Sequence, residues 1–292
     1  MPIDALALVL GGALIHAVWN LFAKRAGGGA AFIFLVCVVS SIACAPFAAA
    51  AWIWQPARPS TGLTGAMWQA MLVSAALHVG YFYALQRGYR EADYSVVYPV
   101  ARGTGPLFSV LGAVLLLGET PGGRGMVGIA LLILGIFVMA GAASLLGRAD
   151  AKTLRGVLWG GATGGFIAIY TLVDGWAIKV LGMLPIVFYP ISVALRALLQ
   201  APLIWPQRHG LAAEWQKNRR NILIVGLLSP LAYVMALHAM QRAPLSFVAP
   251  LREMSMLIAA FLGAWLLKEK LTPARIAGTL LMLLGVWLLV GA

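Results

Sequence analysis

Apolar residues in this chain form long continuous runs, separated by short polar segments. A helix needs about 20 apolar residues to cross a hydrocarbon core ~30 Å thick, and the runs have this length. The pattern predicts an all-α integral membrane protein with ten transmembrane helices. The predicted helices lie at about residues 4–22, 31–54, 65–86, 95–117, 125–146, 154–172, 184–205, 221–241, 247–267 and 273–290.

The composition agrees with a membrane location and leaves no room for a soluble catalytic domain. Of the 292 residues, 62% are hydrophobic and 10% are charged, whereas about 25% of residues are charged in soluble domains. The longest connection, residues 206–220, is basic and is expected to form a surface segment. No Lys or Arg precedes the first apolar run, so we expect no secretory signal peptide and a first helix that stays in the mature protein.

Lys and Arg residues are distributed unevenly between the two sides of the predicted bundle. The connections after the first, third, fifth, seventh and ninth helices hold 14 of them, and the other connections hold 4. Because cytoplasmic loops carry the excess of basic residues, both termini are predicted to be periplasmic. The formal net charge of +12 is therefore a topology signal, and we expect no nucleic-acid partner.

A segment near the middle of the chain is repeated at its end. Residues 128–142 align without gaps with residues 278–292 at an offset of 150, and an offset of 151 brings Pro99 onto Pro250. The chain is thus predicted to consist of two five-helix repeats, residues 1–146 and 147–292. Since five crossings are an odd number, the second repeat is inverted. Inverted repeats are typical of secondary transporters, although duplication also builds channels and some membrane enzymes.

Short motifs within these repeats resemble those of a known group of transporters. Trp19 and Asn20 are adjacent on the first helix, and a Glu-to-Pro turn precedes the last helix of each half, at residues 118–121 and 269–273. Over essentially its whole length the chain resembles the EamA-type members of the drug/metabolite transporter superfamily, and within it the bacterial exporters of aromatic and other amino acids. The resemblance implies export across the bacterial cytoplasmic (inner) membrane and a structural role for Glu119 and Glu269.

Arg102, Arg252 and Glu253 are among the charged residues that lie inside predicted helices, as is Arg196 on the seventh helix. An ionisable side chain at this depth costs about 2.5–3.5 kcal/mol on insertion scales, so it should face the bundle interior and have a partner. Pro99 precedes Arg102 and Pro250 precedes Arg252, and we expect kinked helices at equivalent places in the two halves. Interrupted helices in corresponding positions indicate a transporter's binding site. The alternative is a buried ion pair that only holds helices together.

Helical spacing supplies further candidates, because residues three or four apart share a face. Tyr189, Ser192 and Arg196 form one such stripe on the seventh helix. Aromatic and polar residues on different helices would together form a small-molecule cavity of the usual composition. The complete candidate substrate-binding set is His16, Trp19, Asn20, His78, Tyr81, Tyr98, Arg102, Tyr170, Tyr233, Arg252 and Glu253.

Catalytic motifs are absent from the sequence. It has no phosphate-binding loop, no Gly-x-Ser-x-Gly and no Cys-x-x-Cys or His-Glu-x-x-His pattern, so we expect no enzyme activity, no cofactor and no metal site. The expected partners are a small-molecule substrate and the lipid bilayer. The sequence favours a secondary transporter of small amphiphilic metabolites, and the alternative is an intramembrane enzyme or flippase acting on lipid-linked substrates. Proton coupling and facilitated diffusion both remain open.

Overall fold

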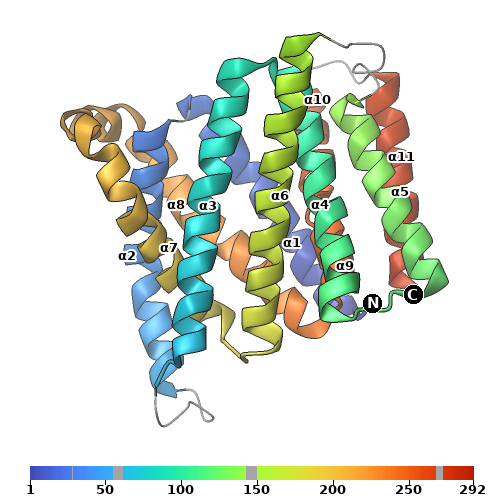
Figure 1. Ribbon diagram of the computed structural model, residues 1–292, viewed down its shortest axis with the longest axis horizontal. Helices are drawn as coiled ribbons and strands as arrows, with labels where there is room; N and C mark the ends of the chain where they lie inside the picture. The colour runs from blue at the N-terminus through green and yellow to red at the C-terminus, as the bar shows by residue number, and fades with distance from the viewer. Residues whose placement is uncertain (28, 55–61, 143–149, 268–271) are drawn as a thin grey trace.

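The computed structural model describes residues 1–27, 29–54, 62–142, 150–267 and 272–292, and the secondary structure of these residues is helical. The helices pack side by side into a bundle, with the two chain ends close together at the lower end (Figure 1). They are α1 (Ile3–Ala26), α2 (Ala30–Trp54), α3 (Gly65–Glu91), α4 (Tyr94–Leu117), α5 (Gly122–Ala140), α6 (Ala151–Lys179), α7 (Pro185–Ile204), the 3-10 helix η2 (Trp205–Gly210), α8 (Leu211–Arg242), α9 (Leu245–Leu251), α10 (Met254–Leu267) and α11 (Pro273–Val290).

The all-helical membrane architecture predicted from the sequence is confirmed. Each predicted run falls on at least one helix. By length and composition, eight segments of the described chain can cross a membrane, and one of them, Pro185–Arg242, contains both α7 and α8. The number of predicted spans is therefore not reproduced by this criterion, although the positions of the helices are.

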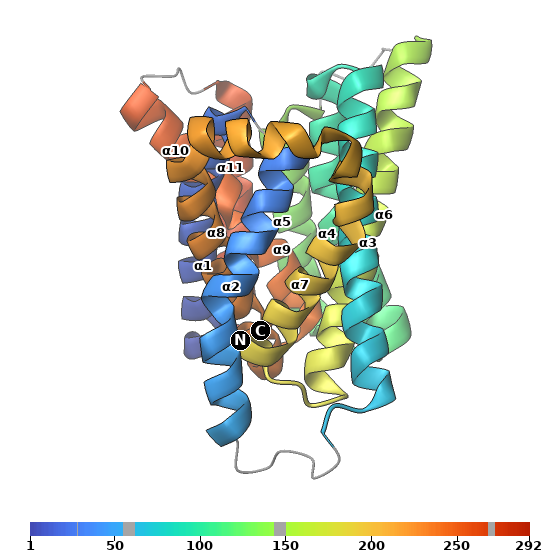
Figure 2. The same ribbon diagram turned by 90° about the vertical axis from the view of Figure 1, so that its left-hand side faces the viewer.

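The connection at 206–220, predicted as a basic surface segment, is helical. The 3-10 helix η2 and the first turns of α8 cross the upper end of the bundle (Figure 2). Asn218 attaches this segment to the end of α1, because its side-chain amide donates to the carbonyl oxygen of Ala26 at 3.3 Å and to Glu214 at 2.8 Å. Hydropathy detects only the part of a helix that lies in hydrocarbon, so it placed the start of α8 too late.

The helix predicted at residues 247–267 is interrupted at Arg252 and Glu253. The amide of Glu253 donates to the carbonyl oxygen of Pro250 and that of Met256 to Glu253, at 3.1 and 2.9 Å, which is the tighter three-residue spacing. In the first half, α4 continues unbroken through Pro99 and Pro106. The second-half helix is therefore broken at the predicted place, whereas the kink expected in α4 stays a prediction.

Glycines hold α5 and α11 against each other. A Cβ atom on Gly128 would lie 3.0 Å from the carbonyl oxygen of Gly285, and one on Gly135 would lie 2.8 Å from that of Gly278. Small residues of this kind let membrane helices approach closely. The beginning of α5 thus meets the end of α11, so these two helices, which the repeat makes equivalent, run antiparallel (Figure 1).

The other helix pairs follow the same symmetry. Helix α1 of the first repeat packs against α8, α9 and α10 of the second repeat. Helix α6, the equivalent of α1, packs against α3 and α4 of the first repeat in the corresponding way. The remaining central pair joins α2 to α7. This is the arrangement of two inverted repeats that interlock across their interface. The predicted boundary between residues 146 and 147 lies outside the described residues.

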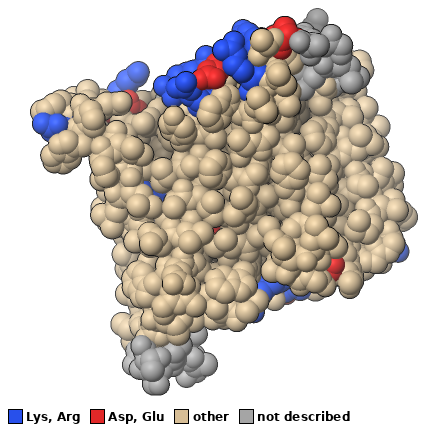
Figure 3. Space-filling model, viewed as in Figure 1, with Lys and Arg blue, Asp and Glu red and all other residues tan. Residues whose placement is uncertain are grey.

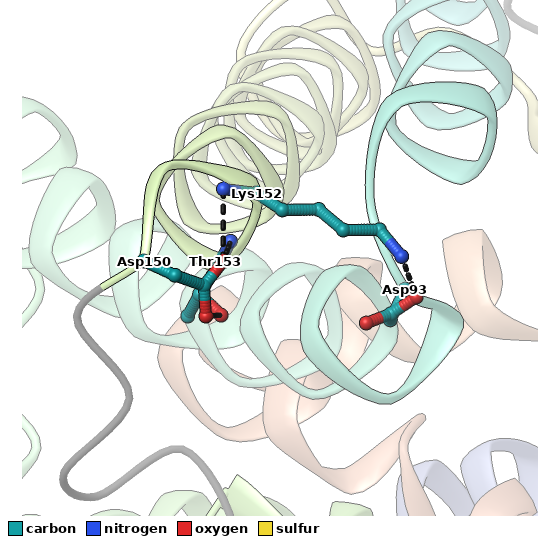
Figure 4. A network of polar contacts seen from close by, with 4 residues as sticks. All are labelled: Asp93, Asp150, Lys152 and Thr153. Carbon is teal, nitrogen blue, oxygen red and sulfur yellow. Dashed lines mark hydrogen bonds and ion pairs between the residues drawn. The ribbon is translucent and has the colours of Figure 1, made fainter.

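Charged residues gather at the two ends of the bundle (Figure 3). Of the Lys and Arg side chains visible on this face, most lie along the upper end. There Asp150 begins α6, accepting hydrogen bonds from the amides of Lys152 and Thr153 at 2.9 Å, while the Lys152 ammonium pairs with Asp93 at the start of α4 (Figure 4). The amide of Thr153, followed by its hydroxyl, holds the pKa of Asp150 below its ordinary value. These contacts join the start of the second repeat to the first.

Glu119 connects the two repeats at the opposite end. Its carboxylate accepts hydrogen bonds from the amides of Leu245 and Ser246 at 2.7 and 2.8 Å, and from the Lys179 ammonium at 2.9 Å. The free amides at the start of α9 therefore have a negatively charged partner. These are the contacts of a helix cap, which agrees with a structural role. The corresponding Glu269 lies outside the described residues.

Glycine substitution tests the contact between α5 and α11. In Gly135→Ala the new methyl group meets backbone atoms of Gly278, and we expect a loss of about 1–3 kcal/mol in unfolding free energy. Gly161→Ala is the matched control, because a Cβ there meets nothing within 4 Å and Ala stabilises a helix by about 0.5–1 kcal/mol relative to Gly. The measurement is thermal unfolding in detergent. Equal melting temperatures for the two variants would contradict the packing.

The pH dependence of stability tests the Glu119 contacts. Burial raises the pKa of Glu119, but the hydrogen bonds from Lys179 and the two amides outweigh it and lower the pKa below its ordinary value. The contribution to stability is therefore complete above the unfolded pKa of about 4.3 and is lost as the pH falls through the folded value.

We expect Glu119→Gln to lower the unfolding free energy by about 1 kcal/mol at pH 7. The loss should become smaller as the pH falls through the pKa of Glu119 in the folded protein. Glu214→Gln is the control, since a glutamine oxygen still accepts the hydrogen bond from Asn218. A Glu119→Gln protein as stable as the wild type at pH 7 would rule out the cap.

Candidate functional site

A cavity of about 350 Å³ lies at the centre of the bundle, between the two repeats. Within the described residues its lining comes from α1 to α4, from α6 to α9, and from the residues between α9 and α10. Both halves of the chain therefore contribute to one chamber. The helices α5 and α11, which pack on each other, lie outside this lining.

Nearly all of the predicted site residues come together in this cavity. The predicted residues in its lining are His16, Trp19, Asn20, His78, Tyr81, Arg102, Tyr170, Tyr233, Arg252 and Glu253. Tyr98 is not in the lining: its ring stacks on Tyr94 with centroids 5.0 Å apart, and the Arg102 guanidinium lies 5.6 Å from its centroid. Tyr98 thus contacts Arg102 without facing the cavity.

One residue of the stripe predicted on α7 does not line the cavity. Tyr189 and Arg196 line the cavity, but Ser192 donates its hydroxyl to the carbonyl oxygen of Phe188 on its own helix. Val193 and Gln200 take the remaining places on the cavity face. Gln200 was missed because it lies near the end of an apolar run, although it is four residues from Arg196 and shares its face.

An ion pair crosses the interface between the repeats beside the cavity. The Arg102 Nη1 atom lies 3.2 Å from Oε2 of Glu253 and 3.5 Å from Oε1, and the two side chains are 22% and 12% exposed. The residues are 151 apart, which is the offset of the repeat, so they occupy equivalent positions. Arg252 makes a different contact, with its guanidinium 4.9 Å from the centroid of the Tyr233 ring.

Aromatic rings from four helices form one wall of the chamber. His78 of α3 stacks on Tyr170 of α6 with centroids 3.9 Å apart, and Tyr233 of α8 lies 5.2 Å from Tyr189 of α7. Tyr233 also donates its hydroxyl to the buried carboxylate of Asp174. Ring faces of this kind accommodate apolar groups and cations.

Several buried polar atoms in the lining have no hydrogen-bond partner among the described residues. They are Nε2 of His16, Nε1 of Trp19, Nε of Arg196, and both amide atoms of Gln200. A buried polar atom without a partner costs about 1–3 kcal/mol. These atoms can therefore bind the polar groups of a ligand. The described residues contain no cluster of three metal-ligating side chains.

The ion pair is tested by removing one charge and then both. Glu253→Gln leaves the Arg102 charge without a partner, and we expect a loss of about 3–5 kcal/mol in unfolding free energy. The double variant R102Q/E253Q removes both charges and should recover most of this loss. Unfolding is followed in detergent, with Glu214→Gln as the surface reference. A single variant as stable as the wild type would contradict the pairing.

Comparisons with known proteins agree with this arrangement. The model of the EamA-like transporter family matches residues 4–141 and 154–291, one match in each repeat. No curated protein matches the chain. One solved structure, titled "Crystal structure of protein", has a TM-score of 0.73 at 16% identity, and the alignment covers 99% of this chain and 96% of that one. At this identity the likeness shows the fold alone. Because the family model covers almost all of the sequence in two units, the chain belongs to the EamA-like transporter family.

Proposed function

We propose that this membrane transporter exports small amphiphilic metabolites, and amino acids in particular, by alternating access to the central cavity. The observation that carries the proposal is the composition of the chamber. Aromatic rings form one wall, and unpaired polar atoms of His16, Trp19, Arg196 and Gln200 face the same space. An amino acid has both an apolar part and strongly polar groups, so it complements both kinds of lining.

The size of the cavity supports a small substrate. Ligand pockets usually measure about 300–1,000 Å³, and a volume of about 350 Å³ lies at the lower end of this range. Aromatic and other neutral amino acids fit the proposal best, because the rings of Tyr81, Tyr170 and Tyr233 offer a surface for an apolar side chain. The alternative from the sequence is an intramembrane enzyme or flippase that acts on lipid-linked substrates. Saturable transport of a soluble amino acid, measured as described below, would argue against this alternative.

The mechanism follows from the inverted repeats. Two halves of opposite orientation can rock around a shared cavity and expose it to one side at a time. The break between α9 and α10 lies beside this cavity and gives the second half a place to bend. Glu253 already forms an ion pair with Arg102. We therefore infer that Glu253 has a structural role, and that the substrate moves down its own gradient without proton coupling.

Transport in liposomes tests the proposed function. We expect the purified protein to catalyse saturable counterflow of at least one labelled neutral amino acid, with none in empty liposomes. Tyr81→Ala should reduce the rate roughly tenfold by removing an aromatic contact in the cavity. Tyr83→Ala on the same helix is the matched control, because Tyr83 is 58% exposed on the outer surface. A folded wild-type protein that transports no amino acid would contradict the proposal.

Reporter fusions test the orientation. We propose that the upper end of the bundle lies in the cytoplasm and both termini in the periplasm of the bacterial inner membrane, and the excess of basic residues at the upper end supports this orientation. An alkaline phosphatase fused to the C-terminus should be active, and a fluorescent protein at the same position should stay dark. The reverse pattern would mean that the bundle has the opposite orientation.

A further inference from the structure

One face of α7 points into the cavity along most of its length. Tyr189, Val193, Arg196 and Gln200 all belong to the lining, and their spacing places them on one side of a helix. The apolar and aromatic part of this stripe lies toward the start of α7, and the polar part lies toward its end. The helix therefore offers a substrate an apolar surface and a polar surface next to each other.

Arg196 is the interior arginine without a direct partner in the described part of the chain. Arg102 is paired with Glu253, and Arg252 lies over the ring of Tyr233. Arg196 has no hydrogen bond, ion pair or ring contact among the described residues, and its Nε atom is buried without an acceptor. A guanidinium carries five N–H donors and no acceptor, so only an acceptor, and best of all an anion, satisfies it.

The acids near the cavity leave this charge unbalanced. Glu253 is paired with Arg102, and the completely buried Asp174 accepts the hydroxyl of Tyr233 with Oδ2, while its Oδ1 has no hydrogen-bond partner among the described residues. Within the described interior, the three arginines Arg102, Arg196 and Arg252 therefore outnumber the two carboxylates, and Arg196 forms an ion pair with neither of them. An unpaired buried charge is strongly destabilising, and an anion bound beside it relieves this cost.

Gln200 supplies a second and independent feature of the same kind. It lies one turn beyond Arg196, is 5% exposed, and has no partner for either its amide nitrogen or its amide oxygen. The nitrogen can donate to a carboxylate that the guanidinium binds. The oxygen can accept from a neighbouring N–H group of the ligand, such as the ammonium of an amino acid.

We propose that Arg196, assisted by Gln200, forms the subsite that binds the carboxylate of the transported molecule. Planar guanidinium groups bind carboxylates through two parallel hydrogen bonds, which gives both strength and orientation. The protein then selects a carboxylate over an uncharged compound of the same shape. This inference rests on the proposed function, because it assigns one end of the substrate within the same cavity.

A matched pair of probes tests the subsite without requiring transport. The anion 3-phenylpropionate and 3-phenylpropanamide have nearly the same shape and differ in charge. We expect calorimetry on the purified wild-type protein to show about tenfold tighter binding of the carboxylate. In Arg196→Gln this preference should fall to within about twofold. Arg196→Lys keeps the charge but lacks the planar guanidinium, so it should retain part of the preference.

Arg220→Gln is the control, because Arg220 is exposed on α8 and should leave the preference unchanged. If Arg196→Gln does not fold, Gln200→Leu serves instead, with a preference reduced by about threefold or more. Binding of the amide as tight as that of the carboxylate, an unchanged preference in the folded variants, or no binding of either probe would overturn the proposal. Amino-acid counterflow that persists in any of these cases would leave the proposed function standing and refute this subsite alone.

Discussion

A charged side chain inside a membrane protein must have a partner or face a polar space, because hydrocarbon offers it neither. This constraint explains the interior of the bundle. Arg102 and Glu253 neutralise each other across the interface of the repeats. Arg252 rests on an aromatic ring, and Asp174 accepts a tyrosine hydroxyl. Arg196 is left facing the cavity, where the transported molecule becomes its partner in our account.

The repeat also explains why the central pair has opposite charges. Equivalent positions of two inverted halves meet near the axis that relates them, and Arg102 and Glu253 are such positions. Identical charges there would repel each other in a medium of low dielectric constant. A duplicated chain therefore has to diverge at this point, and the divergence fastens the two halves together. The glycines of α5 and α11 tolerate identity, because a small residue suits both sides of a close contact.

The sequence predicts much of this fold, because the length of an apolar run and the repeat offset each depend on local residues. Other features depend on tertiary contacts. Helical spacing shows that Tyr189, Ser192 and Arg196 share a face, but Ser192 turns to its own backbone. Tyr98 was predicted to face the cavity and instead stacks on Tyr94. Proline alone does not decide where a helix breaks, since α4 continues through Pro99 while the second-half helix stops after Pro250.

If the cavity between the repeats is the substrate pathway, as we propose, side-specific thiol labelling will detect it. Ser229 lines the cavity, and Leu227 on the same helix is 53% exposed on the outer surface. Each is replaced by Cys in a protein that lacks Cys37 and Cys44. We expect a membrane-impermeant reagent to modify the Cys at position 229 from both sides of the membrane, and to do so more slowly when a transported amino acid is present. The Cys at position 227 should stay unmodified. A Cys at 229 that reacts from neither side, or that substrate does not protect, would contradict it.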